Sequence, residues 1–427
     1  MGARRNDSKE FADSSSGSSS PESRGPSLPS PGPSFPSAAR RFQAVGFSEI
    51  VKVRNRVLDL LAAGHRVWRF EGGEPYMPTP QPIKDAMTAA LARDETRYAP
   101  SSGVPELRRA ILEKVRGKNG IPADDASPIV VNGGMHGLFS AFATLLDPGD
   151  EVLMFSPYWT PILDVITYHG ASAVLVPTAR ARREGLTAAL ARAATPRTKL
   201  LYWNSPVNPT GDVFAREEIE EVCAFLRDRG LAIISDEAYE DLIYDGSAHV
   251  SPASIPGMFE RTISVFTLSK TYSMTGWRAG YVLVPTRWRL PMQTIVLYSI
   301  NGVSTPTQWA ALEALRLSDS FLEEARAGYR RRRDALVAGL RAAGFEIEPP
   351  PAALYLFPKT PASLPVESPA AARTLLDAAR VATVPGVVFG PEGEGHLRFS
   401  FSVSEDTIAG GAAALRTFAT APAPTPL

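Results

Sequence analysis

Two apolar runs of strand length end in side chains of opposite charge. Asp236 follows the run 231–235, and Lys270 follows the run 262–269. A buried strand has little use for a charge, because an ion loses its hydration there unless it is paired. In an open α/β sheet, however, ligands bind at the carboxyl ends of the strands. The two residues therefore indicate either a ligand site or a buried salt bridge at one edge of a sheet.

A lysine and an aspartate brought together in this way could flank pyridoxal phosphate. The amine would form a Schiff base with its aldehyde, and the carboxylate would pair with its ring nitrogen. The phosphate needs an anion seat, and the run 128–131 leads into Asn132, Gly133 and Gly134, where a helical pattern begins. Glycines there let backbone amides approach an anion, and a helix N-terminus supplies unpaired N–H groups. Taken alone, such a turn is more often a tight connection without a ligand.

Polar residues around Lys270 fit the phosphate of the same cofactor. Arg278 lies eight residues further on, and a guanidinium makes paired hydrogen bonds to phosphate. Thr267 and Ser269 flank the lysine and offer hydroxyl donors, although such residues are also ordinary at strand ends. The stretch therefore favours a phosphate site without requiring one.

Two further donors could meet the ring of the cofactor. Asn208 lies in the turn 204–211, where the proline that follows holds it rigidly. Tyr239 lies three residues after Asp236. Hydrogen bonds from both side chains to the phenolate oxygen of the ring would lower the pKa of the Schiff base and favour its neutral form.

Apolar runs alternate with helical patterns through the middle of the chain. The runs are continuous rather than alternating, which indicates a sheet that is covered on both faces. The sequence therefore predicts an α/β fold with a mostly parallel, seven-stranded sheet and helices on both faces. The seven predicted strands are 128–131, 151–155, 173–176, 199–203, 231–235, 262–266 and 280–284.

The pattern changes near residue 312 and predicts a second, smaller α+β domain. A charged helix is expected over 321–340, with short strands at 353–357 and 397–401. Four consecutive arginines, 330–333, point in different directions on a helix, which favours a solvated face over a nucleic-acid patch. The predicted divisions are a disordered Ser/Pro-rich tail (1–44), an N-terminal segment packing with the small domain (45–78), the large cofactor-binding domain (79–312), the small C-terminal domain (313–419) and a C-terminal tail (420–427).

The composition disfavours several classes of protein. The formal net charge of +0 gives no electrostatic reason to expect nucleic acid or a membrane surface as partner. Cys223 is the only cysteine and the five histidines are scattered, so neither a disulfide nor a metal site is expected. The dinucleotide and P-loop glycine patterns do not occur. Because the sequence has no membrane span and no apolar centre of a secretory signal, the cytoplasm is the expected location.

Together these motifs resemble the class I aminotransferases, a family of the pyridoxal-phosphate fold type I superfamily that includes aspartate and aromatic aminotransferases. The motifs follow the family's order over roughly positions 45 to 415. The stretch from Lys270 to Arg278 and the Asn-Pro-Thr-Gly turn are the most specific of them. The matching stretches are 70–75, 97–103, 156–159, 204–211, 235–239, 269–281 and 397–400.

The resemblance implies a role for each matching residue. Lys270 would hold pyridoxal phosphate as a Schiff base and then carry a proton to and from the substrate. Asp236 would pair with the ring nitrogen, and Tyr239 and Asn208 would bind the ring oxygen. The other residues implied at the cofactor are Trp159 on the ring face, Gly133, Gly134, Thr267, Ser269 and Arg278 on the phosphate, Met135 beneath the cofactor, and Tyr98 on the phosphate of a neighbouring subunit.

Three residues bear on the substrate, beside Trp159 and Asn208. Arg398 lies in an alternating, half-buried strand pattern, and a buried arginine without a carboxylate is costly, which favours binding of the substrate α-carboxylate. Gly73 lies in the segment implied to close over the substrate. Met135 stands where acidic-substrate bacterial relatives often have a lysine. A thioether cannot pair with a carboxylate, so strict aspartate specificity is disfavoured, unless Met135 only packs at the start of its helix.

The leading interpretation is a transaminase that moves an amino group between an α-amino acid and a 2-oxo acid by a ping-pong mechanism, in a homodimer with shared active sites. The alternative is another enzyme with the same cofactor, a β-lyase, decarboxylase or racemase, because cleavage of any bond at the α-carbon gives a carbanion that the ring stabilises. A cofactor-binding regulator without activity is disfavoured, because the N-terminal tail is not basic and contains no helix-turn-helix pattern.

Overall fold

The computed structural model describes residues 39, 41, 42 and 49–420. The predicted tails, 1–44 and 420–427, lie outside these residues except for 39, 41, 42 and 420. The described residues 41, 42 and 49–420 belong to one compact unit by their contacts. Among the described residues, no helix is both long enough and apolar enough to cross a membrane. The division into a large and a small domain stays a prediction.

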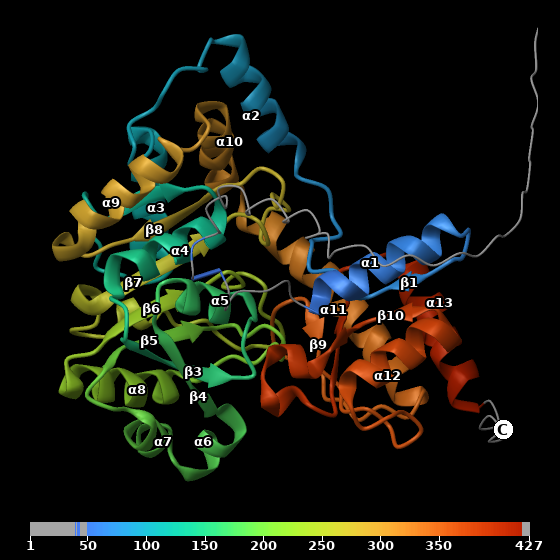
Figure 1. The fold of residues 1–427 in the computed structure, drawn as a ribbon. Helices are drawn as coiled ribbons and strands as arrows, with labels where there is room; N and C mark the ends of the chain where they lie inside the picture. Colours follow the sequence, from blue (N-terminus) through green and yellow to red (C-terminus); the bar gives the residue numbers. More distant parts are fainter. Residues whose placement is uncertain (1–38, 40, 43–48, 421–427) are drawn as a thin grey trace, which may run out of the picture. The chain divides into compact units, whose positions relative to one another are not determined.

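A seven-stranded sheet forms the centre of the unit, as predicted (Figure 1). Its strand order is β2-β8-β7-β6-β5-β3-β4. All neighbours pair in parallel except β8, which is antiparallel to both β2 and β7. The strands are β2 (Pro128–Val131), β3 (Glu151–Ser156), β4 (Ser172–Pro177), β5 (Thr198–Asn204), β6 (Ala232–Asp236), β7 (Thr262–Thr267) and β8 (Gly280–Leu283).

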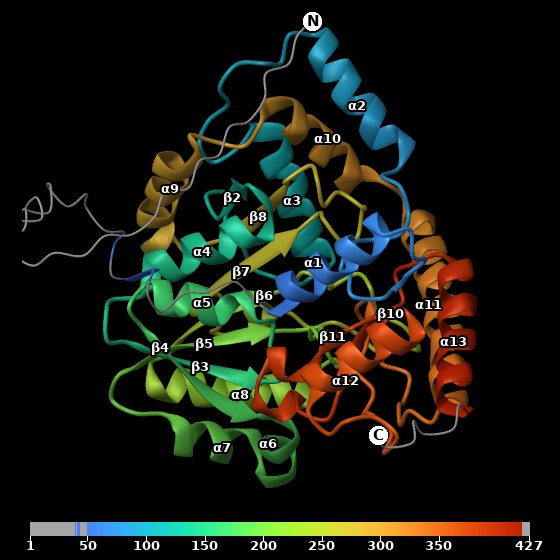
Figure 2. The same ribbon diagram turned by 45° about the vertical axis from the view of Figure 1, so that its right-hand side comes forward.

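Helices cover both faces of this sheet (Figures 1 and 2). In β3, Val152 and Met154 pack with the helices of one face, and Leu153 and Phe155 pack with those of the other, as the pleat of a strand requires. This two-sided burial explains the continuous apolar runs in the sequence. The first face packs with α4 (Gly133–Leu145), α5 (Pro161–Tyr168) and α9 (Thr286–Ile300); the second packs with α6 (Thr178–Glu184), α7 (Leu186–Ala193) and α8 (Arg216–Arg229), and at the β8 end with α2 (Gln81–Ala92), α3 (Pro105–Gly117) and α10 (Thr305–Arg316).

The strands that lead into the candidate site residues end at the same edge of the sheet. Asn204 lies beside Asp236 in the register of β5 and β6, so these two strands end together. At the other side of the sheet, Gly280 lies beside both Val131 and Thr267, which end β2 and β7. The carboxyl ends of four strands thus share one edge, the position at which open α/β sheets bind ligands.

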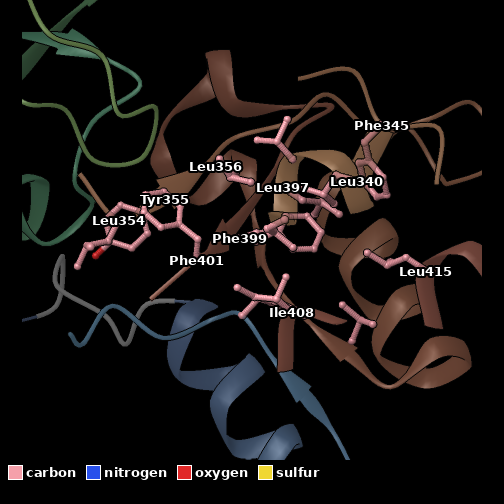
Figure 3. Packing of buried hydrophobic residues seen from close by; sticks show 14 of the residues in the cluster. Leu340, Phe345, Leu354, Tyr355, Leu356, Leu397, Phe399, Phe401, Ile408 and Leu415 are labelled. Carbon is pink, nitrogen blue, oxygen red and sulfur yellow. The ribbon is translucent and has the colours of Figure 1, made fainter. Parts of the chain in front are cut away.

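Two smaller sheets belong to the other part of the unit. One is the pair β1 (Trp68–Arg69) and β10 (Val381–Ala382), and the other has the order β11-β12-β9. Their core contains Leu397, Phe399 and Phe401 (Figure 3). Arg398 alternates with these residues along the chain, so it points to the opposite face of the strand. The remaining elements are β9 (Tyr355–Leu356), β11 (Val384–Pro385), β12 (Leu397–Ser400), α1 (Glu49–Ala62), α11 (Asp319–Ala342), α12 (Ser368–Thr374) and α13 (Glu405–Thr420).

The arginine run on α11 differs from the prediction of a solvated face. Arg333 is buried and pairs with Asp245 and Asp334, and its guanidinium also donates to the carbonyl of Pro350 at 2.9 Å. A long helix that packs on a sheet must turn one of four consecutive residues inward, because the residues are spread around its axis. The two aspartates neutralise the guanidinium there, as burial of a charge requires.

Gly280 lets β8 approach the turn that follows β2. A Cβ on Gly280 would lie 2.6 Å from the carbonyl oxygen of Phe266 and 3.2 Å from the carbonyl carbon of Gly133. Both neighbours are backbone, so we expect Gly280→Ala to lower the free energy of unfolding by about 1–3 kcal/mol, measured by denaturant titration. Gly276→Ala is the matched control, because no heavy atom lies within 4 Å of its Cβ position. Equal stability of the two variants would contradict this close approach.

Candidate active site

The start of α4 and the end of β7 form one end of the site. Gly133 has a φ of +77°, and a Cβ there would lie 2.5 Å from Nη2 of Arg278. A Cβ on Gly134 would lie 3.3 Å from Cβ of Thr267. The Thr267 hydroxyl donates to Oγ of Ser269 at 2.9 Å. The five residues predicted to hold a phosphate therefore lie together, around the N-terminus of a helix.

The guanidinium of Arg278 is held over this helix start by carbonyl groups alone. It donates to the carbonyl of Thr275 at 2.8 Å and to that of Asn132 at 3.2 Å. Within the described part of the chain, no carboxylate pairs with it. An exposed cation beside unpaired helix N–H groups can attract an anion, and the glycines leave room for the anion to reach the backbone.

Lys270 and Asp236 lie at the centre of the same sheet edge. The Lys270 amine donates to the carbonyl of Gly73 at 2.8 Å. Asp236 is only 4% exposed, and its carboxylate accepts hydrogen bonds from the Tyr202 hydroxyl at 2.8 Å and from the amide of Ala238 at 3.3 Å. Tyr202 was not predicted as a site residue. It lies on β5, beside the strand that carries Asp236, and its sequence position looks like that of any buried strand tyrosine.

Burial raises the pKa of Asp236 to about 6, although the hydrogen bond from Tyr202 and the charge of Lys270 act in the opposite direction. The buried carboxylate therefore holds its charge at some cost at neutral pH. A cationic N–H group placed against it would remove this cost, which is what a protonated ring nitrogen offers.

Arg398 forms a third corner of the site. It is only 4% exposed, and it donates to Oδ1 of Asn208 at 3.1 Å and to the carbonyl of Glu71 at 3.0 Å. Its Nε has no hydrogen-bond partner, and no carboxylate pairs with it in the described residues. Its guanidinium carbon lies 4.3 Å from the ring centre of Tyr355 and 4.9 Å from that of Phe389. A buried cation with neutral acceptors only is ready for an anionic ligand.

Tyr239 meets a residue that sequence reasoning missed. Its hydroxyl lies 2.8 Å from the hydroxyl of Tyr355, which comes from β9, and both rings are buried. The Tyr355 hydroxyl also lies 2.7 Å from the Cβ position of Gly73, so a larger residue at Gly73 would displace it. Tyr355 sits in an apolar strand, and its sequence context gives no sign of a polar role.

Trp159 and Met135 lie on the same side of the sheet. Both are partly buried against the cluster formed by α4, α5 and the strands. The segment of Trp159 is held from the other side, because the amide of Tyr158 donates to the carbonyl of Phe389 at 2.9 Å and the Thr160 hydroxyl donates to the carbonyl of Val388 at 2.6 Å. Met135 is the third residue of α4, directly after the glycines.

Tyr98 is the one predicted site residue that the chain itself does not bring into the site. Its side chain is 88% exposed. The loop that carries it is nevertheless fixed, since the hydroxyl of Thr305 donates to the carbonyl of Arg97 at 2.6 Å and the Gln293 amide donates to Ser101 at 2.9 Å.

The segment that carries Asp236 and Tyr239 is anchored from behind by side-chain contacts of its acidic residues. Three acidic residues of this segment take part. One of them, Asp241, also accepts a hydrogen bond at 3.1 Å from Thr271, the neighbour of Lys270. The network therefore holds the aspartate and the lysine segments to one another. It contains the ion pairs of Glu240 with Lys114 and of Asp241 with Lys118, and the hydrogen-bond contact between Glu237 and His249 at 2.7 Å.

The raised pKa of Asp236 has a consequence for stability without cofactor. Its ionised form is disfavoured by folding, so the cost is present above pH 6 and disappears as pH falls toward 4, where the folded chain has taken up the proton. Without cofactor, we expect Asp236→Asn to have a higher free energy of unfolding than the unchanged protein at pH 8, by at most about 3 kcal/mol. This difference should shrink as the pH falls. Urea titrations across pH measure it, with the exposed Asp228→Asn as control. A difference independent of pH would refute the expectation.

Comparison with known proteins agrees with this geometry. The sequence matches the family described as aminotransferase class I and II over residues 67–415. It is 40% identical over 376 residues to the aspartate/prephenate aminotransferase of Thermus thermophilus, covering 87% of this chain and 95% of that protein. It is 35% identical over 372 residues to aromatic-amino-acid aminotransferase 2 of Thermococcus litoralis, covering 86% and 94%.

Solved structures give the same result. The aspartate aminotransferase of Thermus thermophilus with maleate superimposes with a TM-score of 0.84 at 38% identity, covering 90% of this chain and all of that one (100%). The aromatic aminotransferase of Pyrococcus horikoshii gives a TM-score of 0.79 at 35% identity, covering 85% and 98%. The resemblance expected from the motifs is confirmed. The chain belongs to the class I and II aminotransferase family and is a transaminase.

Proposed function

We propose that this transaminase works with pyridoxal phosphate bound at the shared strand edge, joined to Lys270. The observation that carries the proposal is the meeting of an amine, a buried carboxylate and an anion cradle within one site. When bound, this cofactor supplies a ring that withdraws electrons from the α-carbon of the amino acid. The family assignment favours transfer of the amino group over the lyase, decarboxylase and racemase alternatives.

The phosphate fits the cradle of Gly133, Gly134, Thr267, Ser269 and Arg278. Substituting either glycine would fill the space in front of Arg278 or Thr267 with a side chain. The ring nitrogen fits Asp236, whose charge has no cationic contact at hydrogen-bond distance among the residues that the structure describes. Trp159 is the aromatic residue proposed to cover the ring face.

Asn208 and Tyr239 are proposed to donate to the ring oxygen. Arg398 already occupies Oδ1 of Asn208, which leaves the amide N–H groups of that side chain as donors. Tyr239 has a single proton to donate. Both donors stabilise negative charge on the ring oxygen and thereby favour the neutral lysine linkage that reacts with an incoming amine.

Arg398 is proposed to bind the substrate α-carboxylate. The carboxylate would replace the neutral oxygens of Asn208 and Glu71 with a charge-assisted, paired contact. This orients the α-carbon toward Lys270, whose amine then takes and returns the α-proton. The carbonyl of Gly73 accepts a hydrogen bond from the Lys270 amine. Gly73 therefore lies close to both events, the binding of the carboxylate and the transfer of the α-proton. A 2-oxo acid takes up the amino group in the second half of the ping-pong reaction.

A homodimer with shared sites is part of the proposal. Tyr98, Leu290 and Tyr298 are 88%, 75% and 84% exposed, although apolar rings and chains of this size are usually covered. The Tyr98 loop is bonded to α9, the helix of the other two residues. Ser299, next to Tyr298, contacts His136 in the first turn of α4 at 2.8 Å. A partner on this surface would thus lie beside the phosphate end of the site.

We further propose that the amino donor has an uncharged side chain. The similar proteins are named for aspartate, prephenate and aromatic amino acids. Met135, next to the cradle, offers a polarisable apolar surface and no charge. Its position at the start of α4 directs the preference toward aromatic or aliphatic side chains rather than carboxylates.

Lys270→Ala tests the proposed chemistry. The variant should lose the visible absorbance that the protein acquires with pyridoxal phosphate, lose trapping by borohydride, and lose turnover by at least about 10²–10⁴-fold, because it lacks both the linkage and the proton carrier. Lys359→Ala, at an exposed lysine, is the control and should behave as the unchanged protein. Undiminished turnover in Lys270→Ala would refute the mechanism.

Met135→Lys tests the substrate preference. A charge-assisted hydrogen bond contributes about 1.5–3 kcal/mol, so the ratio of kcat/KM for aspartate over leucine or tyrosine should rise by roughly 10- to 100-fold. Met135→Leu keeps the apolar surface and should leave the ratio within about threefold. Steady-state kinetics with a panel of donors give both ratios. If the lysine variant keeps the ratio of the unchanged protein, Met135 does not contact the substrate side chain.

A further inference from the structure

Tyr355 contacts three separate parts of the site. Its hydroxyl lies 2.8 Å from that of Tyr239 and 2.7 Å from the Cβ position of Gly73. Its ring faces the guanidinium of Arg398 at 4.3 Å. The described structure shows no other side chain that contacts the proposed ring-oxygen donor, the carboxylate-binding arginine and the closing segment together.

We propose that Tyr355 is a positioning residue that sets the donor strength of Tyr239 through its hydroxyl and the orientation of Arg398 through its ring. This inference rests on the proposed function, because Tyr239 acts on the ring oxygen of the cofactor. The two effects come from different atoms of one side chain, so substitutions can separate them.

The hydroxyl effect follows from proton counting. A tyrosine hydroxyl has one proton to donate and two lone pairs that accept. If Tyr239 donates to the ring oxygen, its contact with Tyr355 must be one that it accepts, so Tyr355 is the donor. A hydroxyl that accepts one hydrogen bond becomes a stronger donor for the next, especially where water is excluded. Tyr355 thereby strengthens the bond that lowers the pKa of the lysine–cofactor linkage.

The ring effect follows from the contacts of Arg398. A guanidinium over an aromatic face is attracted by the ring, and the attraction grows when the pair is buried. Tyr355 lies at 4.3 Å and Phe389 at 4.9 Å, so aromatic faces fix the plane of the guanidinium. Neither ring uses an N–H group of the arginine, so its donors stay available for a carboxylate.

The backbone around Tyr355 is built to hold this position. Ala353 is buried and has a φ of +62°, a conformation that costs a residue with a Cβ roughly 1–2 kcal/mol. Strained backbone of this kind persists where surrounding contacts enforce it. The amide of Ala353 donates to the carbonyl of Leu242 at 2.9 Å, and the Tyr244 hydroxyl donates to the carbonyl of Ala353 at 2.8 Å. The chain segments that carry Tyr239 and Tyr355 are therefore bonded to one another.

Few charged groups act on Tyr239 and Tyr355 in the described structure, and the test variants leave these groups in place. The groups that act on Tyr239 besides Tyr355 are Arg398 and Asp236. Lys270 approaches from the other side, through Gly73. Because Tyr355→Phe leaves all three in position, a change in the lysine–cofactor linkage can be assigned to the lost hydroxyl.

The experiment compares Tyr355→Phe and Tyr355→Leu as purified, cofactor-loaded proteins. For Tyr355→Phe, we expect the midpoint of the visible absorbance change with pH to rise by about 0.5–1 pH unit, the shift of one ordinary hydrogen bond, with KM for the amino donor within about twofold. For Tyr355→Leu, we expect the same shift and a KM raised by about 5- to 30-fold, because the cation–π contact is lost as well.

Tyr329→Phe is the matched control, because Tyr329 is a buried tyrosine of the same core that, in the described structure, shares no hydrogen bond or ring contact with Tyr239, Tyr355 or Arg398. It should leave midpoint and KM unchanged. The inference would be overturned if the protein without substitutions has its visible band and either Tyr355→Phe keeps the same midpoint or Tyr355→Leu keeps the same KM. Absence of that band in the unchanged protein would instead overturn the proposed function, and the inference with it.

Discussion

The ionised carboxylate of Asp236, held at the end of a buried strand, is the interaction on which the site depends. Burial opposes its charge, while one phenol and one amide hydrogen bond support it. The parallel arrangement of β5, β6 and β7 supplies the position, because it brings the ends of these strands to one edge. The ion pairs behind the segment then keep the aspartate and the lysine segments in register. The sheet, the ion pairs behind the segment and the phosphate cradle thus all help to present the Asp236 carboxylate and the Lys270 amine to the same ligand.

The predictability of this arrangement differs from residue to residue. The seven apolar runs predicted the strands well, because burial on both faces leaves a signal in every residue of the run. The sequence also marked Lys270 and Asp236, since a charge at the end of a buried run has few structural explanations. The pair Gly133 and Gly134 was a weaker signal, because a tight connection without a ligand also explains it. The antiparallel direction of β8 could not be predicted, because an apolar run has the same pattern in either direction.

The contacts that complete the site left no local pattern. Tyr202 meets Asp236 only because two strands pair in a particular register, and Tyr355 meets Tyr239 from a strand 116 residues further along the chain. The acceptors for Arg398 and Lys270 include backbone carbonyls of Glu71 and Gly73, which any residue could provide. Arg333 was predicted on a solvated face but is buried. The sequence did not indicate this burial, because the partner Asp245 lies far from Arg333 in sequence. Long-range pairing decides these features, and a single sequence does not encode it in composition or spacing.

Three of the contacts that join the seven-stranded sheet to the rest of the site are individually weak and therefore easily exchanged. Arg398 with Asn208, Tyr239 with Tyr355, and Lys270 with Gly73 are each worth about 0.5–1.5 kcal/mol as neutral hydrogen bonds, and somewhat more where the donor is charged. A substrate carboxylate offers Arg398 a paired, charge-assisted contact that is roughly twice as strong as the neutral contact it replaces. Binding is thus favoured without any new cation having to be buried, since the cost of burying Arg398 is already met by the fold. The N–H groups of the Asn208 amide are available to the ring both before and after this exchange, because Arg398 contacts only the oxygen of that side chain.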